Sequence, residues 1–280
     1  MSEPLDLRGR TVLITGAARG IGALLAAEVA RRGARPSLVG IEPETMERVA
    51  EAIRTETGVE TFVAEADVRD RAALDRAVEG TISALGGIDV CVANAGVETA
   101  SSVLNHDPDD FRRVIDINLI AVFSTLQATL PAVIERRGHL LPIASLAAIG
   151  HAPAMSAYAA SKAGVEALAN SLRQELAGTG TTVGCGYFTF LDTDMVRDGF
   201  QHPVAAELRK DVARGPFGKV YPVEPAITAL ADGIENRSRT VMFPKWIKPV
   251  AKLRGITQPL LEKLAGSKAA DAIRRAESRS

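Results

Sequence analysis

The sequence has few of the side chains that bind metals or form disulfides. Its 280 residues contain two cysteines, Cys91 and Cys185, each inside an apolar run that predicts a buried strand. They lie far apart and have no CxxC spacing, so we expect neither a disulfide nor a thiolate ligand. The histidines show no HExxH or paired spacing, which predicts no metal site; they are His106, His139, His151 and His202.

Long apolar segments are also missing. The N-terminal stretch MSEPLDLRGR lacks the apolar core of a signal peptide, and no apolar run approaches the roughly 18 residues that a membrane span needs. We therefore expect a cytoplasmic protein without stable membrane insertion. Apolar residues make up 46% of the chain and charged residues 24%, and no repeat or low-complexity linker divides it. Length and composition predict one domain that folds unaided, and we expect no nucleic-acid partner.

Short apolar runs alternate with longer amphipathic ones along the body of the chain. Strands of this kind, apolar on both faces, are typical of a parallel sheet covered by helices. We therefore expect an α/β, doubly wound Rossmann fold, a seven-stranded parallel sheet with helices on both faces. Pro142 lies inside the fifth strand without a ladder donor, so we expect a bulge there. The expected strands are 11–15, 36–40, 61–66, 88–96, 139–145, 181–188 and 240–243.

A glycine cluster, TGAARGIG at residues 15–22, directly follows the first strand and opens the first helix. Gly16 permits a tight turn, Gly20 lets the backbone approach a pyrophosphate, and Gly22 lets helix and strand pack closely. The phosphates would lie at the positive N-terminus of the helix. We expect a dinucleotide-binding loop here that includes Arg19 and Ile21, although its spacing differs from the usual GxGxxG.

Tyr158 precedes Lys162 by four residues in the alanine-rich run SAYAASKAG, which predicts a helix. Residues four apart lie on one helical face, so the lysine charge can lower the pKa of the phenol. A phenol of lowered pKa is suited to proton transfer. Taken alone, the spacing also fits a surface tyrosine beside a solvated lysine.

The glycine loop, with YAASK about 140 residues later, is similar to the classical short-chain dehydrogenases/reductases, whose glycine motif has this TGxxxGxG spacing. The resemblance covers roughly residues 8–243. It implies that Asp67 and Val68 contact the adenine ring. It also implies that Asn94, Ala95 and Gly96, in the run VANAG, support the sheet beside the cofactor.

The same resemblance implies a catalytic tetrad of Asn118, Ser145, Tyr158 and Lys162. Hydride transfer between a nicotinamide and a carbonyl carbon needs a tuned proton donor and a second hydrogen bond for orientation. Tyr158 would donate or accept the proton, and Ser145 would hold the substrate oxygen. Lys162 would keep the phenol acidic and bond the nicotinamide ribose, while Asn118 would hold a water that links Lys162 to solvent.

The run after the sixth strand departs from the family pattern. Phe188 and Thr189 stand where Pro-Gly usually forms a shelf under the nicotinamide, although Thr193 is in register to bond the carboxamide. The bulk of Phe188 makes the shape of the substrate cavity hard to foresee. The residues expected around the substrate, including those near His151, are mostly apolar, which favours a lipophilic alcohol or ketone.

The residues at the end of the second strand indicate which nicotinamide cofactor is preferred. Gly40 stands where an acidic residue often takes the adenosine ribose diol and repels a 2′-phosphate. Arg19 could pair with that phosphate, and Glu42 could still reach the diol. We therefore expect NADP or NAD, with a lean to NADP.

Three functions fit these motifs. The first is an NAD(P)-dependent alcohol dehydrogenase or carbonyl reductase acting on a secondary alcohol or ketone. The second is a 3-oxoacyl-thioester reductase, which would need a basic patch for the carrier's phosphate; residues 194–220 offer five basic side chains among four acidic ones. The third is a nucleotide-sensing protein without catalysis, which predicts loss of a tetrad residue, and none is lost.

The C-terminal segment differs in charge from the body of the chain. Residues 244–280 carry nine basic and three acidic side chains, a net of +6, whereas residues 1–243 carry a net of −7. Apolar residues from Trp246 to Leu253 follow helical spacing. We expect residues 1–243 to form the catalytic domain and residues 244–280 a basic amphipathic helical extension. It would pack on that domain as a surface helix or lid or on a neighbouring subunit of a homodimer or homotetramer, with a membrane surface as the remaining alternative.

Overall fold

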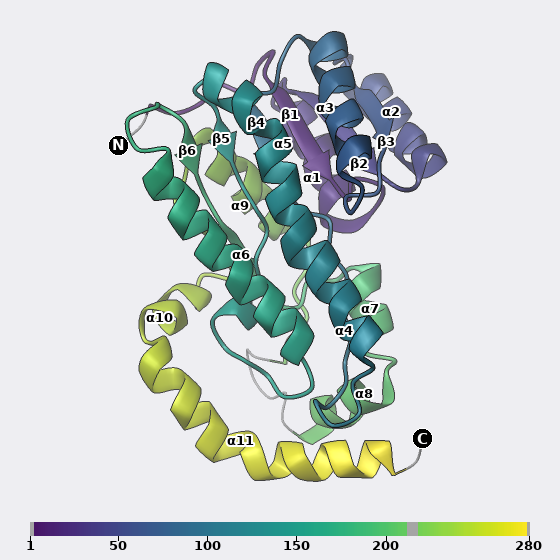
Figure 1. The fold of residues 1–280 in the computed structure, drawn as a ribbon, viewed down its shortest axis with the longest axis vertical. Coiled ribbons are helices and arrows are strands. Elements are labelled where there is room, and N and C mark those ends of the chain that lie inside the picture. The colour runs from purple at the N-terminus through teal and green to yellow at the C-terminus, as the bar shows by residue number, and fades with distance from the viewer. Residues whose placement is uncertain (1–2, 212–217, 279–280) are drawn as a thin grey trace.

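Residues 3–211 and 218–278, which the computed structural model describes, fold around a six-stranded parallel sheet (Figure 1). The strand order is β3-β2-β1-β4-β5-β6. β1 pairs with both β2 and β4, so the order reverses there and leaves a crevice beyond the carboxyl ends of the strands. The strands are β1 (Thr11–Thr15), β2 (Arg35–Gly40), β3 (Phe62–Glu65), β4 (Val90–Val92), β5 (His139–Leu140) and β6 (Thr182–Val183).

Helices cover both faces of the sheet, which confirms the doubly wound α/β prediction. Val12 and Ile14 of β1 face one helical layer and Leu13 faces the other, because alternate strand residues point to opposite sides. The first layer contains α1 (Gly20–Arg31), α2 (Pro43–Thr57) and α9 (Glu224–Glu235). The second contains α3 (Arg71–Leu85), α5 (Ala121–Glu135) and α6 (Ser156–Glu175).

The sheet has six strands rather than the predicted seven because the expected sixth strand is divided. Its second half, β7 (Gly186–Phe188), pairs with β8 (Val241–Phe243) as a separate parallel pair. Pro142 explains the break, since it lacks the N–H that β5 would donate to this neighbour. Bonds resume on both sides: the Gly184 N–H donates to the Leu140 carbonyl and the Ala144 N–H to the Gly186 carbonyl, each at 2.8 Å. The ladder is interrupted at Pro142 rather than bulged, so that expectation was wrong.

One continuous helix runs from Pro108 to Glu135 and combines α4 (Pro108–Ile115), a π-helical turn η1 (Asp116–Ile120) and α5. By length and composition alone this helix could cross a membrane, which corrects the expectation that no segment was apolar enough. Here it covers the sheet, with Val122 and Leu126 in the core. A long helix of a protein core has the same apolar composition as a membrane-spanning helix.

The C-terminal residues pack on the body of the molecule as α10 (Ile247–Lys252) and α11 (Arg254–Glu277). α11 lies along α8 (Pro203–Asp211), which follows α7 (Asp194–Gly199) (Figure 1). Ile273 and Ala276 of α11 pack with Ala154 and Val204. Arg254 also pairs with Glu166 of α6 at 3.1 Å. These contacts place α11 beside the loops that follow the strands.

Candidate active site

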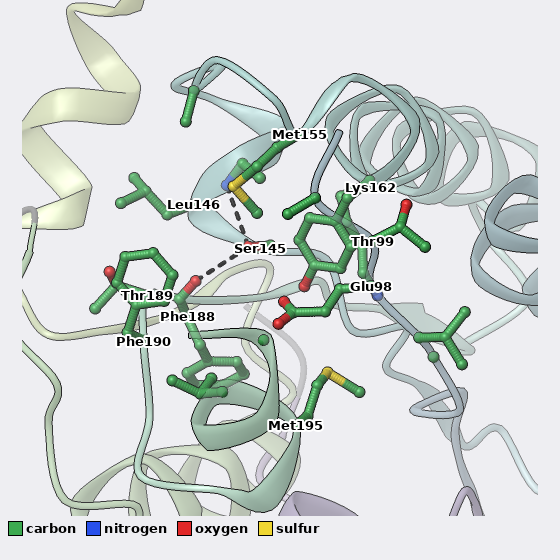
Figure 2. Close-up of a pocket in the computed structure, with 18 of the residues that line it drawn as sticks. Glu98, Thr99, Ser145, Leu146, Met155, Lys162, Phe188, Thr189, Phe190 and Met195 are labelled. Atoms are coloured by element: carbon green, nitrogen blue, oxygen red, sulfur yellow. Dashed lines mark hydrogen bonds between the residues drawn. The ribbon is translucent and has the colours of Figure 1, made fainter. Parts of the chain in front are cut away.

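A cavity of about 1290 Å³ opens at the carboxyl ends of the strands. It extends from the glycine loop past the segments after β4 and β5 to α7, α8 and α11. Figure 2 shows the part of it that Ser145, Lys162, Phe188, Phe190 and Met195 line. Every site residue predicted from the sequence lines this cavity except Gly22 and Asn118, which lie behind its wall.

The glycine loop between β1 and α1 is packed too tightly for side chains at two of its glycines. A Cβ on Gly22 would lie 2.3 Å from the Gly16 carbonyl oxygen, and one on Gly16, where φ is +65°, would lie 2.9 Å from the Ala95 Cα. Gly20 is less crowded, since a Cβ added there would be in ordinary contact with the Thr193 Cγ2 at 3.9 Å. The N-cap residue Arg19 makes no capping hydrogen bond with its side chain, which leaves the first N–H groups of α1 able to bind a phosphate.

Thr15 and Asn94 fix this loop to the end of β4. The Thr15 hydroxyl accepts hydrogen bonds from the N–H groups of Asn94 at 3.0 Å and Ala95 at 3.2 Å. The Asn94 Nδ2 donates to the carbonyls of Thr15 at 3.0 Å and Gly16 at 3.3 Å. These bonds hold β1 and β4 together at the point where the strand order reverses. We did not predict a role for Thr15, although it directly precedes Gly16.

Ion pairs border the outer end of the groove, beyond β2 and β3. Arg19 pairs with Glu42, so the arginine is not a free cation in this structure. Asp67 accepts the Arg69 N–H at 2.9 Å and also pairs with its guanidinium, which lowers the pKa of the Asp67 carboxyl. Both pairs lie on the cavity surface.

Asn118 is fully buried in the π-helical turn η1, a form that is frequent at functional sites. Its Oδ1 accepts the Val97 N–H at 2.8 Å. Its Nδ2 donates to the Val97 carbonyl at 2.8 Å and to the Ser161 Oγ at 3.2 Å. The side chain therefore fixes the backbone of the segment after β4, which carries Gly96 and Glu98 into the cavity.

Ser145 follows β5, and Tyr158 and Lys162 lie on the first turns of α6. The Ser145 Oγ donates to the Phe188 carbonyl at 3.3 Å and accepts the Ala147 N–H at 3.1 Å. The Lys162 Nζ donates to the Ile143 carbonyl at 2.9 Å and lies 5.6 Å from the centre of the Tyr158 ring. The fold thus brings a hydroxyl, a phenol and an ammonium together at one end of the groove.

Burial dominates the titration of this group. Burial, and then the negative charge of Glu98, raise the pKa of Tyr158 to about 12, while the Ser145 hydroxyl acts in the opposite direction. Burial also lowers the pKa of Lys162 to about 8. Burial and Glu98 thus outweigh any lowering of the pKa of the phenol, and the role expected of Lys162 stays a prediction. The ammonium is directed to the Ile143 carbonyl, and a carboxylate lies near the phenol.

Known proteins resemble this chain in sequence and in fold. Residues 10–203 match the family model described as short chain dehydrogenase. The 3-dehydrosphinganine reductase TSC10A of Arabidopsis thaliana is 35% identical over 176 residues, which are 61% of this chain and only 53% of that protein. The 3-oxoacyl-(acyl-carrier-protein) reductase FabG of Chlamydia muridarum is 30% identical over 80% of this chain and 90% of that protein. A crystal structure of levodione reductase has a TM-score of 0.77 and 27% identity, over 85% of this chain and 96% of that chain.

The chain belongs to the short-chain dehydrogenase family.

Short-chain dehydrogenases bind NAD(P), and the groove of this member fits such a cofactor. The glycine loop leaves the uncapped N-terminus of α1 facing the cavity, where a pyrophosphate would accept hydrogen bonds from its N–H groups. Gly20 and Thr193 form the two sides of the groove at this point. From there the cavity continues to Tyr158 and Lys162, where the nicotinamide end would lie.

The residues that replace the family's Pro-Gly have separate roles in this short-chain dehydrogenase. Phe188 is 5% exposed and packs in the core, while its carbonyl oxygen accepts the Ser145 hydrogen bond. Thr189 lines the cavity, and Thr193 directly precedes α7, with its hydroxyl donating to the Leu191 carbonyl at 3.4 Å. The bulk of Phe188 therefore goes mainly into the core rather than across the nicotinamide end of the groove.

Two features of the site were not foreseen from the sequence. Glu98 projects into the cavity, and burial raises the pKa of its carboxyl to about 7. Its position, two residues past Gly96 after a predicted strand, was a usable signal. Gln258 of α11 bonds the backbone of His151, its Oε1 accepting the N–H at 3.0 Å and its Nε2 donating to the carbonyl at 3.3 Å. That contact joins distant segments, and no local pattern in the sequence indicates it.

Proposed function

We propose that this protein is an NAD(P)-dependent carbonyl reductase that acts on lipophilic ketones and, in reverse, on secondary alcohols. One observation carries the proposal: Ser145, Tyr158 and Lys162 meet in a cavity that is continuous with the dinucleotide groove. The wall around them is rich in apolar side chains, which favours a substrate with a large apolar part. These apolar residues include Leu146, Met155, Phe190, Met195, Val196 and Phe200.

The cofactor, when bound, supplies the hydride that reaches the carbonyl carbon. Ser145 donates a hydrogen bond to the carbonyl oxygen, and Tyr158 gives its phenol proton to that oxygen as negative charge develops. The products are the alcohol, the oxidised cofactor and a phenolate that takes a proton back from solvent. A phenol with a pKa of about 12 holds its proton at neutral pH, so the free site is prepared for reduction. Oxidation needs the phenolate, which becomes abundant only at alkaline pH.

Lys162 has two parts in this proposal. Its ammonium, charged below a pKa of about 8, stabilises the phenolate left after proton transfer. The same group also bonds the nicotinamide ribose, and the position of Lys162 on the cavity wall supports this assignment. Asn118 acts as a positioning residue, because both ends of its amide hold the Val97 backbone.

Reduction of a 3-oxoacyl thioester is the second candidate. Arg209 lines the cavity, and its guanidinium stacks on the Phe200 ring at 3.9 Å, so it could meet a carrier's phosphate. Other basic side chains of this region are already paired: Arg197 with Asp194, and Lys210 with Glu207. Arg214 lies outside the described residues. We therefore place ketones before thioesters, and the complete tetrad argues against a protein that only senses nucleotides.

We propose that the Arg19–Glu42 pair, together with Gly40, sets the choice between NAD and NADP. The lean to NADP depended on the missing carboxylate at Gly40 and on an Arg19 able to pair with a phosphate, whereas the structure pairs Arg19 with Glu42. With the pair intact, Glu42 can accept hydrogen bonds from the ribose diol. A 2′-phosphate would have to take Arg19 away from Glu42. We therefore retain NADP or NAD as the cofactor without a preference.

We propose that residues 244–280 are an extension of the catalytic domain, residues 1–243, that closes the substrate end of the cavity. Ala269 and Ile273 of α11 line the cavity, and the helix is bonded to the loop after β5 through Gln258. A long apolar substrate would contact α11 from inside. The assembly is proposed to be a homodimer or homotetramer, since the outer face of α4, η1 and α5 exposes apolar side chains; these are Phe111, Ile120 and Phe123.

Assays of purified protein with NADH and NADPH test this function directly. The panel contains ketones of increasing apolar length and matched 3-oxoacyl thioesters. We expect cofactor oxidation with the ketones and a kcat/KM that rises with chain length. Turnover of thioesters alone would favour the second candidate, and no turnover of any carbonyl compound would contradict both.

A further inference from the structure

Glu98 places a carboxylate in the catalytic end of the cavity. It follows the segment that Asn118 fixes through Val97, so its backbone has a defined position. Figure 2 shows the carboxylate directed into the cavity between Ser145 and Met195. The carboxylate contacts the end of α7, since a Cβ added to Gly199 would lie 1.8 Å from the Glu98 Oε1. A reacting group bound at Ser145 and Tyr158 would therefore have this carboxylate beside it.

This carboxylate has no cation beside it, whereas three other acidic groups of the cavity are paired, and Glu262 at the α11 end accepts a hydrogen bond from the Gln258 Nε2 at 2.9 Å. Glu42 pairs with Arg19, Asp67 with Arg69, and Asp194 with Arg197. Within residues 3–211 and 218–278, Glu98 has neither an ion pair nor a hydrogen bond, and burial alone accounts for its raised pKa. A carboxylate withdrawn from water without a partner costs free energy, which a cation bound beside it would offset.

The surroundings of Glu98 restrict which cation fits. Tyr158 and Ser145 are needed for the carbonyl oxygen, and Lys162 is held by the Ile143 carbonyl. Two of the side chains that Figure 2 labels around it, Met195 and Phe190, are apolar and offer no acceptor for a cation. A small ammonium group attached to an apolar chain satisfies both parts of this wall.

We propose that Glu98 binds a protonated amine of the substrate, and that the substrate class is a lipophilic ketone with an ammonium group one or two carbons from the carbonyl. This inference rests on the proposed ketone reduction. The spacing follows from the closeness of the two groups, because the charge of Glu98 acts on the phenol that serves the carbonyl oxygen. The apolar chain would then extend toward α11.

A matched pair of ketones tests the inference. In 1-aminoundecan-2-one an ammonium group replaces one terminal methyl group of dodecan-3-one, so the two differ mainly in charge. For the unmodified enzyme we expect a kcat/KM at least about tenfold higher for the amino ketone. In the Glu98→Gln variant this preference should fall below about threefold, with kcat/KM for dodecan-3-one changed by less than about threefold.

Glu262→Gln is the control, because it removes a carboxylate that lines the same cavity from α11 rather than from the segment after β4. It should keep the preference for the amino ketone. The proposal would be overturned if the unmodified enzyme showed no preference for the amino ketone, or if the Glu98→Gln variant kept that preference. Loss of turnover on both ketones in Glu98→Gln would also overturn it, since Glu98 would then serve Tyr158 rather than the amine.

Binding of a non-reacting amine separates this inference from the proposed function. Calorimetric titration with decylamine and decan-1-ol should show tighter binding of the amine to the enzyme saturated with reduced cofactor, and this difference should disappear in Glu98→Gln. If the amine binds in this way but no ketone is reduced, the proposed function fails and the role of Glu98 stands. If ketones are reduced without selective amine binding, the inference fails and the function stands.

Discussion

Adding one methyl group at Gly22 tests the dinucleotide groove without touching the chemistry. The new Cβ would lie 2.3 Å from the Gly16 carbonyl oxygen and 2.9 Å from the Asn94 Nδ2, whereas ordinary contact begins at 3.4 Å. The start of α1 must therefore move away from the loop by about 1 Å. Overpacking of this kind costs about 1–3 kcal/mol of stability, and relieving it moves the N–H groups that would bind the phosphate, so we expect Gly22→Ala to weaken cofactor binding about 10- to 100-fold.

Fluorescence titration with NADH and NADPH gives the Kd directly, and a thermal melt shows whether the variant is folded. Gly255→Ala is the control, because Gly255 lies in α11 with nothing within 4 Å of an added Cβ. That variant should bind both cofactors like the parent. A folded Gly22→Ala protein with an unchanged Kd would refute the assignment of the glycine loop as the phosphate-binding site.

Three further predictions concern the same groove and its cover. Lys162→Ala should lower kcat about 100-fold and also weaken cofactor binding, because one ammonium serves the phenol and the ribose; an unchanged Kd would remove the second role. Gly40→Asp should shift the ratio of kcat/KM with NADPH to kcat/KM with NADH toward NADH, because it adds a negative charge near a 2′-phosphate. Glu42→Gln should shift the same ratio toward NADPH, because it frees Arg19. If neither variant shifts the ratio, these residues do not face the ribose. Deletion of residues 245–280 should leave a folded, cofactor-binding protein with a higher KM for long-chain ketones or a smaller assembly, and unchanged kinetics with unchanged mass in solution would contradict the proposed cover.

The layered fold could be predicted from the sequence because its signals are local. Strands such as β1 are short and apolar, and the glycine loop directly marks the turn into α1. The buried free thiols of Cys91 and Cys185 lie in apolar runs, as the sequence indicated. The sequence also indicated a disturbance of the strand at Pro142. Whether it is a bulge or an interrupted ladder depends on which neighbouring strand loses a hydrogen bond, and therefore on the order of strands in the sheet.

The electrostatics of the site could not be predicted in the same way. The four-residue spacing of Tyr158 and Lys162 correctly indicated one helical face, but the pKa of the phenol depends on its burial and on Glu98, 60 residues earlier in the chain. The pairing of Arg19 with Glu42 joins two different loops. Burial and charge pairing arise only when distant segments pack, so a motif predicts which residues meet but not how they titrate.

The turnover of Tyr158→Phe tests the central claim most directly, because this variant removes only the proton that the ketone oxygen receives. With NADH or NADPH and a lipophilic ketone, the account predicts that kcat falls at least about 100-fold while the cofactor Kd stays within about threefold. Tyr221→Phe is the matched control, since that hydroxyl accepts a hydrogen bond from Trp246 at 3.0 Å; it should keep most of the activity. A Tyr158→Phe protein that retains more than a few per cent of the parent kcat would contradict the account.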